Sequence, residues 1–172
     1  KIFTDFEEGA IDILVGTQMV TKGLDFQNVS LVGILDADGM LSHSDFRSNE
    51  RAFQLMAQVA GRAGRNNKQG IVMIQTKQPN HHVIKFVIDN NFKAFFEKEL
   101  LEREAFKYPP YYRLIRITIK HRLIDYLNYA SQEFAKQLKD MFGNRILGPE
   151  FPPISRIKNM YHKNILVKIE RT

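Results

Sequence analysis

The sequence predicts an α/β protein in which a parallel sheet with helices is followed by a small α+β domain. Short apolar runs at 11–15, 29–35 and 70–76 are continuous, as is typical of parallel strands buried on both faces. Between them, residues 47–60 repeat apolar side chains at helical spacing. The later cluster from Tyr108 to Tyr112 contains two prolines, which cannot continue a helix and therefore predict a domain boundary.

The first part is expected to alternate strands and helices. A helical pattern over 1–8 leads into a strand at Ile11–Val15, and the runs at 29–35 and 70–76 supply two more strands. The helix over 47–60 should pack its apolar stripe on the sheet, and Gly61 should end it. The stripe consists of Ala52, Leu55, Met56 and Val59.

The second part begins with a helical connection over 80–107, interrupted at Asp89-Asn90-Asn91. Its phenylalanines recur at helical spacing, which favours a core role over a base-stacking platform. After the boundary we expect a strand at Arg113–His121, a long amphipathic helix, a stop at Gly143, a Leu147-Gly148-Pro149 turn and a strand near 164–169. The apolar side of the long helix would hold Leu123, Leu127, Ala130, Phe134, Leu138 and Met141. The predicted domains are 1–78, 79–107 and 108–172.

Composition excludes some classes of protein. The chain has 172 residues, 44% of them apolar, and no cysteine, so it has neither disulfides nor thiolate metal sites. No apolar run is long enough to span a membrane, and no signal peptide opens the chain. The net charge of +6 suits a polyanionic partner, but soluble proteins of other classes also carry such a charge.

The placement of the positive charge is more informative. Strand alternation puts Arg116 and Lys120 on the face opposite Ile115, Ile117 and Ile119, so both are candidate DNA contacts. A solvated sheet face remains an equal alternative. Further basic residues lie nearby or in the last third: Arg113, His121, Arg122, Arg145, Arg156, Lys158, Lys163 and Lys168.

Two motifs point to nucleotide chemistry. The run from Gln58 to Arg65 sets two guanidinium groups three residues apart on a glycine-punctuated turn, a shape suited to a terminal phosphate. The run from Gly16 to Phe26 puts a hydroxyl and an amide where a strand ends, the usual ligand side of an α/β sheet. Alone, the arginine run is also typical of a basic turn that ends a helix; the two runs together favour the nucleotide site.

These two runs resemble conserved motifs five and six in the second RecA-like lobe of superfamily two helicases. Three further stretches, Leu35–Gly39, Asp45–Arg51 and Tyr108–Tyr111, are similar to the family of primosomal replication-restart helicases, the primosomal protein N-prime or PriA family. The resemblance covers nearly the whole chain. It is strongest from Ile11 to Thr76 and thinner beyond Pro110.

The resemblance implies an ATP-dependent DNA helicase that restarts stalled replication forks, and it assigns roles to residues. Arg65 would be the arginine finger on the γ-phosphate with Arg62 as its partner, and Gln58 would orient one of them or the attacking water. Gly23 and Asp25 would lie on the nucleotide side. The expected DNA contacts are Thr17, Gln18 and Lys22, with Arg47 as a further candidate beside Arg116 and Lys120.

The resemblance also implies ATP, Mg²⁺ and a set of partners. The sequence contains no phosphate-binding Gly-rich loop with Lys-Ser/Thr and no magnesium-binding Asp-Glu pair, so a first lobe before Lys1 would carry them. We therefore expect a carboxy-terminal fragment that is inactive alone. The family's zinc cluster has no ligands here. Expected partners are forked or single-stranded DNA, replication-restart and primosome proteins and single-stranded-DNA-binding protein, in the bacterial cytoplasm at the nucleoid and not at a membrane.

Other functions remain open on the sequence. Another superfamily two motor, an RNA or branch-migration helicase, would share both motifs, and a non-motor nucleic-acid-binding module would use only the basic strand. No metal site is expected, because His81 and His82 are adjacent and cannot share a helical face as zinc ligands do. The aspartates between 36 and 45 lack calcium-loop spacing. We interpret 36–51 as an ordered connection whose charges pair within the lobe.

Overall fold

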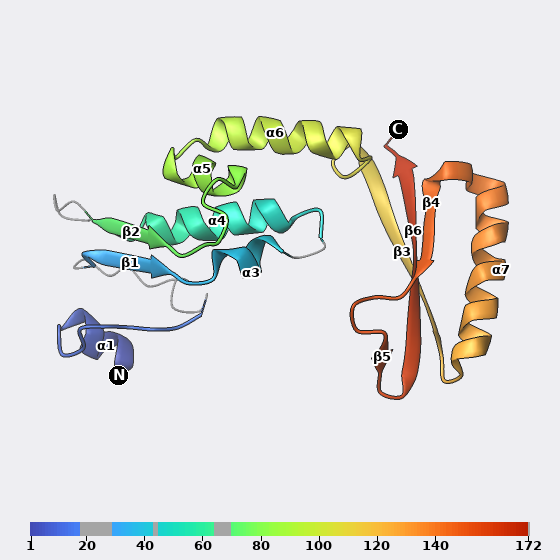
Figure 1. Ribbon diagram of the computed structural model, residues 1–172, viewed down its shortest axis with the longest axis horizontal. Coiled ribbons are helices and arrows are strands. Elements are labelled where there is room, and N and C mark those ends of the chain that lie inside the picture. Colours follow the sequence, from blue (N-terminus) through green and yellow to red (C-terminus); the bar gives the residue numbers. More distant parts are fainter. Residues whose placement is uncertain (18–28, 43–44, 64–69, 172) are drawn as a thin grey trace. The chain divides into compact units, whose positions relative to one another are not determined.

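A computed structural model describes residues 1–17, 29–42, 45–63 and 70–171 of the chain. The chain divides into two compact units, Lys1–Glu99 and Leu100–Thr172, here called the first and the second unit. Each unit contains both helices and strands, so the α/β class is confirmed (Figure 1).

The first unit is a parallel pair of strands with helices. Its elements in order are α1 (Ile2–Glu7), β1 (Leu31–Ile34), α3 (Ala37–Leu41), α4 (Ser48–Ala60), β2 (Ile71–Ile74), α5 (His82–Ile88) and the first part of α6 (Phe92–Ala105). β1 and β2 are hydrogen-bonded in parallel with Leu31 opposite Ile71. A parallel pair needs a crossover connection, and α3 and α4 lie within it.

The core of the first unit lies around α4. Met56 and Val83 are fully buried, and the ring of Phe53 stacks on that of Phe95 with centroids 4.3 Å apart. Ile34 of β1 belongs to the same cluster, so α4 packs on the sheet as the spacing of its apolar residues predicts. Gly61 caps the helix and donates its backbone N–H to the carbonyl of Ala57 at 3.0 Å.

Two expectations for this sheet are wrong. Ile11–Val15 lies outside any helix or strand, and Ile13 and Val15 are 78% and 80% exposed. An apolar run becomes a strand only where a neighbour pairs with its backbone, and β1 pairs with β2 instead. The pair is also covered on one face only, because Leu31, Ile71 and Met73 remain more than half exposed.

The helical pattern of residues 80–107 is confirmed as two helices, with the break where the sequence predicts it. α5 ends at Ile88 and α6 begins at Phe92, and Asn90 between them has a φ of 49°, the left-handed conformation that asparagine tolerates. The core role of the phenylalanines holds for Phe95, at 2% exposure. Phe96 is 49% exposed, so only one side of α6 is buried.

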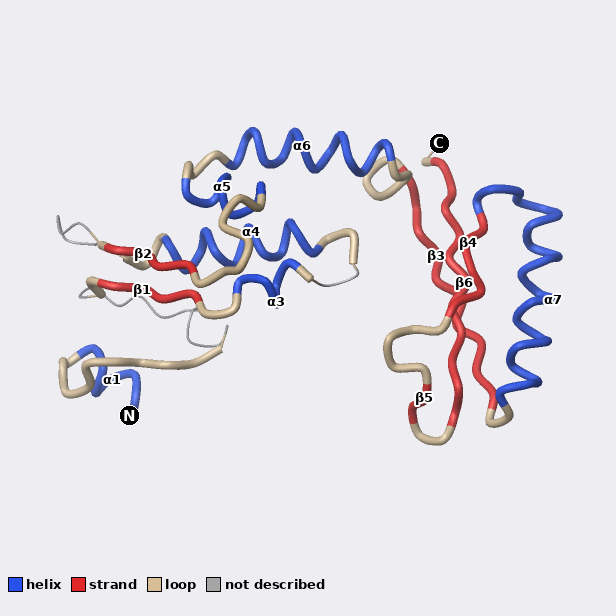
Figure 2. The backbone as a smooth tube through the Cα atoms, viewed as in Figure 1, coloured by secondary structure: helices blue, strands red, loops and turns tan. Residues whose placement is uncertain are grey.

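The second unit is an antiparallel sheet with one long helix. It contains β3 (Tyr112–His121), α7 (Ile124–Phe142), the 3₁₀ turn η1 (Gly143–Arg145), β4 (Ile146–Glu150), β5 (Arg156–Ile157) and β6 (Met160–Glu170). The sheet order is β3-β6-β4, and β5 pairs with the same edge of β6 as β4 does. β6 is therefore the central strand (Figure 2).

The helix α7 buries part of the expected stripe. Leu127 is fully buried and Leu138 packs against the core, as the sequence predicts, whereas Phe134 and Met141 are 39% and 74% exposed. The other buried residues are Ser131 and Ala135, and Ala135 packs with Ile146, Ile165 and Val167. The long helix is confirmed, but its buried side is rotated toward Ser131 and Ala135.

The expected turn at Leu147-Gly148-Pro149 lies instead within β4. Leu147 pairs with Leu166 and Glu150 with Asn164, so the register shifts between them and the strand bulges. Gly148 has a φ of 96°, and a Cβ there would lie 2.7 Å from the carbonyl oxygen of Asn164. Glycine thus allows the strand to stay paired where the residue pattern resembles a turn.

We predict that Leu127→Ala lowers the free energy of unfolding of the second unit by about 2 to 5 kcal/mol, because it leaves a cavity under α7. Met141→Ala on the same helix should change it by less than about 0.5 kcal/mol, since that side chain is exposed. Urea unfolding followed by circular dichroism measures both. Equal effects of the two substitutions would contradict the observed orientation of α7.

Candidate nucleic-acid interface

The end of α4 carries two of the residues assigned to nucleotide chemistry. Gln58 is exposed in its last turn, and Arg62 follows the Gly61 cap half-buried, with its backbone N–H donated to the carbonyl of Val59 at 3.0 Å. The helix ends at Ala60, so Arg62 lies just beyond it and the two residues flank its carboxy-terminal end. Arg65 lies outside the described residues.

The strand-contact motif is described only at its start. Thr17 is exposed, in a stretch without helix or strand. The other candidates in that run, Gln18, Lys22, Gly23 and Asp25, lie outside the described residues.

The connection after β1 is ordered by its own aspartates. Asp38 accepts hydrogen bonds from the backbone N–H of Lys77 at 2.7 Å and from Oγ1 of Thr76 at 2.9 Å, which ties α3 to the end of β2. The Lys77 N–H and then the Thr76 hydroxyl hold the pKa of Asp38 below its usual value, because both donors favour the carboxylate. Asp36 caps α3 by accepting from the backbone N–H of Gly39 at 3.2 Å.

The start of α4 is held in the same way. Asp45 accepts from the backbone N–H of Arg47 at 3.0 Å and forms an ion pair with Arg51 at 3.1 Å. The guanidinium of Arg47 lies 5.0 Å from the centre of the Phe46 ring. The ion pair of Asp45 with Arg51 agrees with the expectation that the charges of this connection pair within the lobe. Within the described ranges no three His, Asp or Glu side chains gather as metal ligands would.

The basic strand of the second unit has the alternation that the sequence predicts. Ile117 and Ile119 pack on the core beside α7, and Arg116 and Lys120 are exposed. Arg116 pairs with Leu166 and Lys120 with His162 across β6. Ile115 departs from the pattern, because it is 48% exposed. The two cations therefore lie on the sheet face away from α7.

Several other basic residues have structural partners instead. Arg145 donates to both carboxylate oxygens of Glu170, at 2.8 and 3.0 Å, and this contact lowers the pKa of Glu170. Lys168 donates to the carbonyl of Phe106 at 2.7 Å, and burial, then repulsion by Lys107, lowers its pKa. These cations stabilise the second unit and are poorly placed to bind a polyanion.

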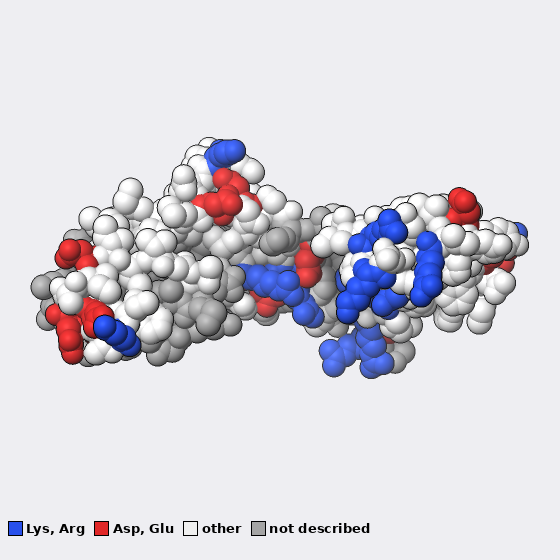
Figure 3. All heavy atoms as spheres, turned by 90° about the horizontal axis from the view of Figure 1, so that it is seen from below, with Lys and Arg blue, Asp and Glu red and all other residues white. Residues whose placement is uncertain are grey.

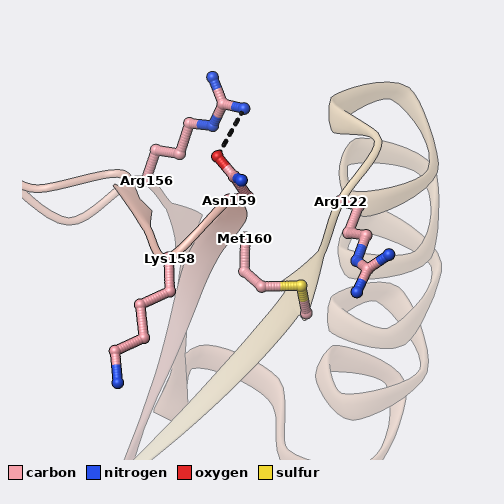
Figure 4. Close-up of a pocket in the computed structure, with 5 residues that line it drawn as sticks. All are labelled: Arg122, Arg156, Lys158, Asn159 and Met160. Atoms are coloured by element: carbon pink, nitrogen blue, oxygen red, sulfur yellow. Dashed lines mark hydrogen bonds between the residues drawn. The ribbon is translucent and has the colours of Figure 1, made fainter.

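A second group of cations surrounds an open hollow of about 470 Å³. Figure 3 shows lysine and arginine side chains gathered on one face of the second unit. The hollow is lined by Arg122, Arg156, Lys158, Asn159 and Met160. In Figure 4, Arg156 and Lys158 extend from the β5–β6 hairpin and Arg122 from the end of β3, with Met160 between them. Arg156 and Lys158 are neighbours along the sequence, and strand pairing brings Arg122 to them.

Both parts of the chain match families of known proteins. Residues 1–67 match the family model of the helicase conserved C-terminal domain, and residues 104–172 match that of the primosomal protein N C-terminal domain. Replication restart protein PriA of Bacillus subtilis is 43% identical over 99% of this chain, that of a Synechocystis species 42% over 97%, and that of Thermotoga maritima 35% over 94%. The chain spans 22%, 20% and 22% of these relatives.

The first match defines the class: the chain carries a helicase C-terminal domain. The second match and the relatives define the particular family. The chain belongs to the PriA family of replication restart proteins, as the Asp45–Arg51 run and the tyrosine-proline cluster predict. In the part of the chain that the structure describes, no helix is long and apolar enough to cross a membrane.

We predict that Asp38→Asn lowers the melting temperature of the first unit at neutral pH. The folded-state pKa of Asp38 is lowered, so its carboxylate stabilises the fold above the unfolded-state pKa, and that contribution is lost as the pH falls through the folded-state pKa. The difference in melting temperature between variant and wild type should therefore shrink as the pH is lowered.

Differential scanning calorimetry at several pH values measures this difference. Asp89→Asn, at the exposed end of α5, is the control for loss of one negative charge. A constant difference for Asp38→Asn across the pH range would show that its carboxylate does not act through ionisation.

Proposed function

We propose that this chain is part of an ATP-dependent DNA helicase that restarts stalled replication forks. In this proposal, residues 1–78 form the carboxy-terminal part of a second RecA-like lobe, 79–107 a helical connection and 108–172 a small α+β domain. The observation that carries the proposal is the joint match: a helicase domain and a primosomal domain follow each other in one chain. That pairing argues against an RNA or branch-migration helicase and against a binding module without a motor.

On the nucleotide side, Arg65 would contact the γ-phosphate, with Arg62 as its partner and Gln58 orienting one of them or the attacking water. Gly23 and Asp25 would brace this side. The position of Gln58 and Arg62 at the carboxy-terminal end of α4 supports the assignment. Guanidinium groups suit developing phosphate charge because they are planar and permanently charged.

ATP would supply the phosphoanhydride bond that is cleaved, and Mg²⁺ would neutralise negative charge on the phosphates. The sequence holds no Gly-rich phosphate loop and no magnesium-binding Asp-Glu pair, so this chain would supply Arg62, Arg65 and Gln58, with Gly23 and Asp25 beside them. The proposal assigns the remaining ATP and Mg²⁺ ligands, and the zinc site, to the part of the relatives that this chain does not span. The chain alone is then inactive as an ATPase.

On the DNA side, Thr17, Gln18 and Lys22 would hold one strand through phosphate and sugar, which a translocating motor needs because it must ignore sequence. Arg47 would add a contact at the start of α4. Its guanidinium is exposed over Phe46 and is thus positioned at the surface. A second contact area would be Arg116 and Lys120 on the open face of β3.

The partners would be forked or single-stranded DNA, primosome and other replication-restart proteins, and single-stranded-DNA-binding protein. The relatives named above are bacterial. In this proposal, replication restart takes place in the cytoplasm, at the nucleoid.

We predict that Arg65→Ala in the full-length protein lowers DNA-stimulated ATP turnover by about 10³-fold or more, by analogy with other arginine fingers. DNA affinity should change little, because the guanidinium acts on the phosphate. Steady-state ATPase assays and fluorescence anisotropy with forked DNA measure the two quantities. Near-normal turnover in the variant would remove Arg65 from the mechanism.

We predict that the 172-residue chain binds DNA weakly, with strong salt dependence and no sequence preference. Replacing Arg116 and Lys120 by Ala should reduce the slope of log affinity against log salt by about 0.7 to 0.9 for each lost phosphate contact. Anisotropy titrations between about 50 and 200 mM salt measure the slope.

Arg145→Ala is the matched control, because it removes one positive charge that already pairs with Glu170. If it reduces the slope per charge as much as the double variant does, the face of β3 is an ordinary solvated surface.

A further inference from the structure

Strand pairing at one end of the second unit places aromatic and cationic side chains in a row. His121 at the end of β3 lies opposite Tyr161 of β6, and Tyr161 lies opposite Arg156 of β5. Side chains directly opposite one another on antiparallel strands share a face and lie close together. Three strands thus contribute neighbouring members of one row.

The helix that follows β3 extends the row. The ring of Tyr126, in the first turn of α7, lies 5.5 Å from the ring of His121. The backbone N–H of Leu123 donates to Nδ1 of His121 at 3.0 Å, which fixes the orientation of the imidazole. At the other end, the guanidinium of Arg156 lies 5.1 Å from the centre of the Tyr161 ring. The row therefore runs Tyr126, His121, Tyr161, Arg156.

Most of the row is accessible. Tyr126 is 65% exposed, His121 is exposed and Tyr161 is half-buried, whereas rings that served only the core would be covered. The described ring contact of Tyr126 with His121 leaves most of the tyrosine side chain exposed to solvent. Surfaces that bind unpaired nucleic acid usually combine exposed aromatic rings, on which bases stack, with cations that contact the phosphates.

The basic hollow adjoins the row, because Arg156 belongs to both. Arg122, which follows His121 directly, and Lys158, in the β5–β6 turn, line the hollow with Arg156 (Figure 4). The only hydrogen bond drawn among the lining residues joins Arg156 to Oδ1 of Asn159 at 3.3 Å. The lining residues include no carboxylate, so the local charge is positive and suits phosphate oxygens.

We propose that this end of the second unit is a binding site for unpaired single-stranded DNA. The bases stack on Tyr126 and the adjacent His121 and Tyr161, and Arg122, Arg156 and Lys158 hold the phosphates. The site is distinct from the predicted contacts Arg116 and Lys120, which bind backbone alone. The inference rests on the proposed function only in taking DNA as the partner of the chain.

Stacking decides the form of DNA that the site accepts. In a duplex each base is already covered by its neighbours, whereas an unpaired base exposes a π-face to a protein ring. A duplex could engage the cations but not the rings. The site should therefore prefer single strands to duplexes, without sequence preference, because every base has a π-face.

The test is fluorescence anisotropy of the 172-residue chain with a labelled oligodeoxythymidylate and with a hairpin duplex of equal charge. Tyr126→Ala should weaken binding of the oligodeoxythymidylate by about 5- to 100-fold and leave duplex binding nearly unchanged. Tyr126→Phe should restore it, because phenylalanine keeps the ring. Arg122→Ala with Lys158→Ala should lower the salt slope by about 0.7 for each lost contact.

Tyr129→Ala is the matched control. Tyr129 is on the same helix, 70% exposed, and no described ring contact joins it to the row. Circular dichroism verifies that each variant is folded. Equal losses for Tyr126→Ala and Tyr129→Ala, or failure of Tyr126→Phe to restore binding, would overturn the stacking site.

Two further outcomes separate the inference from the proposed function. If Tyr126→Ala has no effect but the Arg116 and Lys120 variant still loses affinity, the stacking site is wrong and DNA binding by the chain stands. If the chain binds neither DNA probe but binds a polyglutamate peptide through Tyr126, the surface takes an acidic protein, and both proposals fail.

Discussion

The pairing of β3 with β6 is the constraint on which most of the second unit depends. The pairing runs without interruption from Tyr112 opposite Glu170 to His121 opposite Tyr161. Because side chains alternate between faces, this register directs Ile117 toward α7 and Lys120 toward solvent. A shift of one residue would bury the lysine under the helix and expose the isoleucine. The same register brings His121 beside Tyr161, so the core and the proposed stacking site have a common origin.

In the first unit, α4 is the element that joins the two proposed activities. Its N-terminal end carries Arg47, held by Asp45, and its C-terminal end carries Gln58 and Arg62. The thirteen residues of α4 separate these ends by about 20 Å, and the fully buried Met56 anchors the helix to the core. In the proposed function, a displacement of α4 at Gln58 and Arg62 would move Arg47 with it, which is the coupling a motor requires.

The candidate site was predictable to the extent that it depends on contiguous residues. The arginine run and the Asp45–Arg51 run each carry their spacing along the chain, so family and class followed from sequence. The row from Tyr126 to Arg156 could not be predicted in this way, because its members come from three strands and a helix. The positive charge of a residue in the sequence also did not show whether it has a structural partner. Arg145 pairs with Glu170, whereas Arg156 lines an open hollow.

The sequence by itself determined the α/β class, the helices other than α3 and the break before Phe92, because these depend on local periodicity and on residues that end helices. Tertiary structure decided the rest. It left Ile11–Val15 outside the strands, it buried Leu127 but left Met141 of the same predicted side of α7 exposed, and it kept Gly148 inside β4. In each case the residues permit two conformations of similar local energy. The choice is made by whichever neighbour hydrogen-bonds the backbone or covers the apolar face.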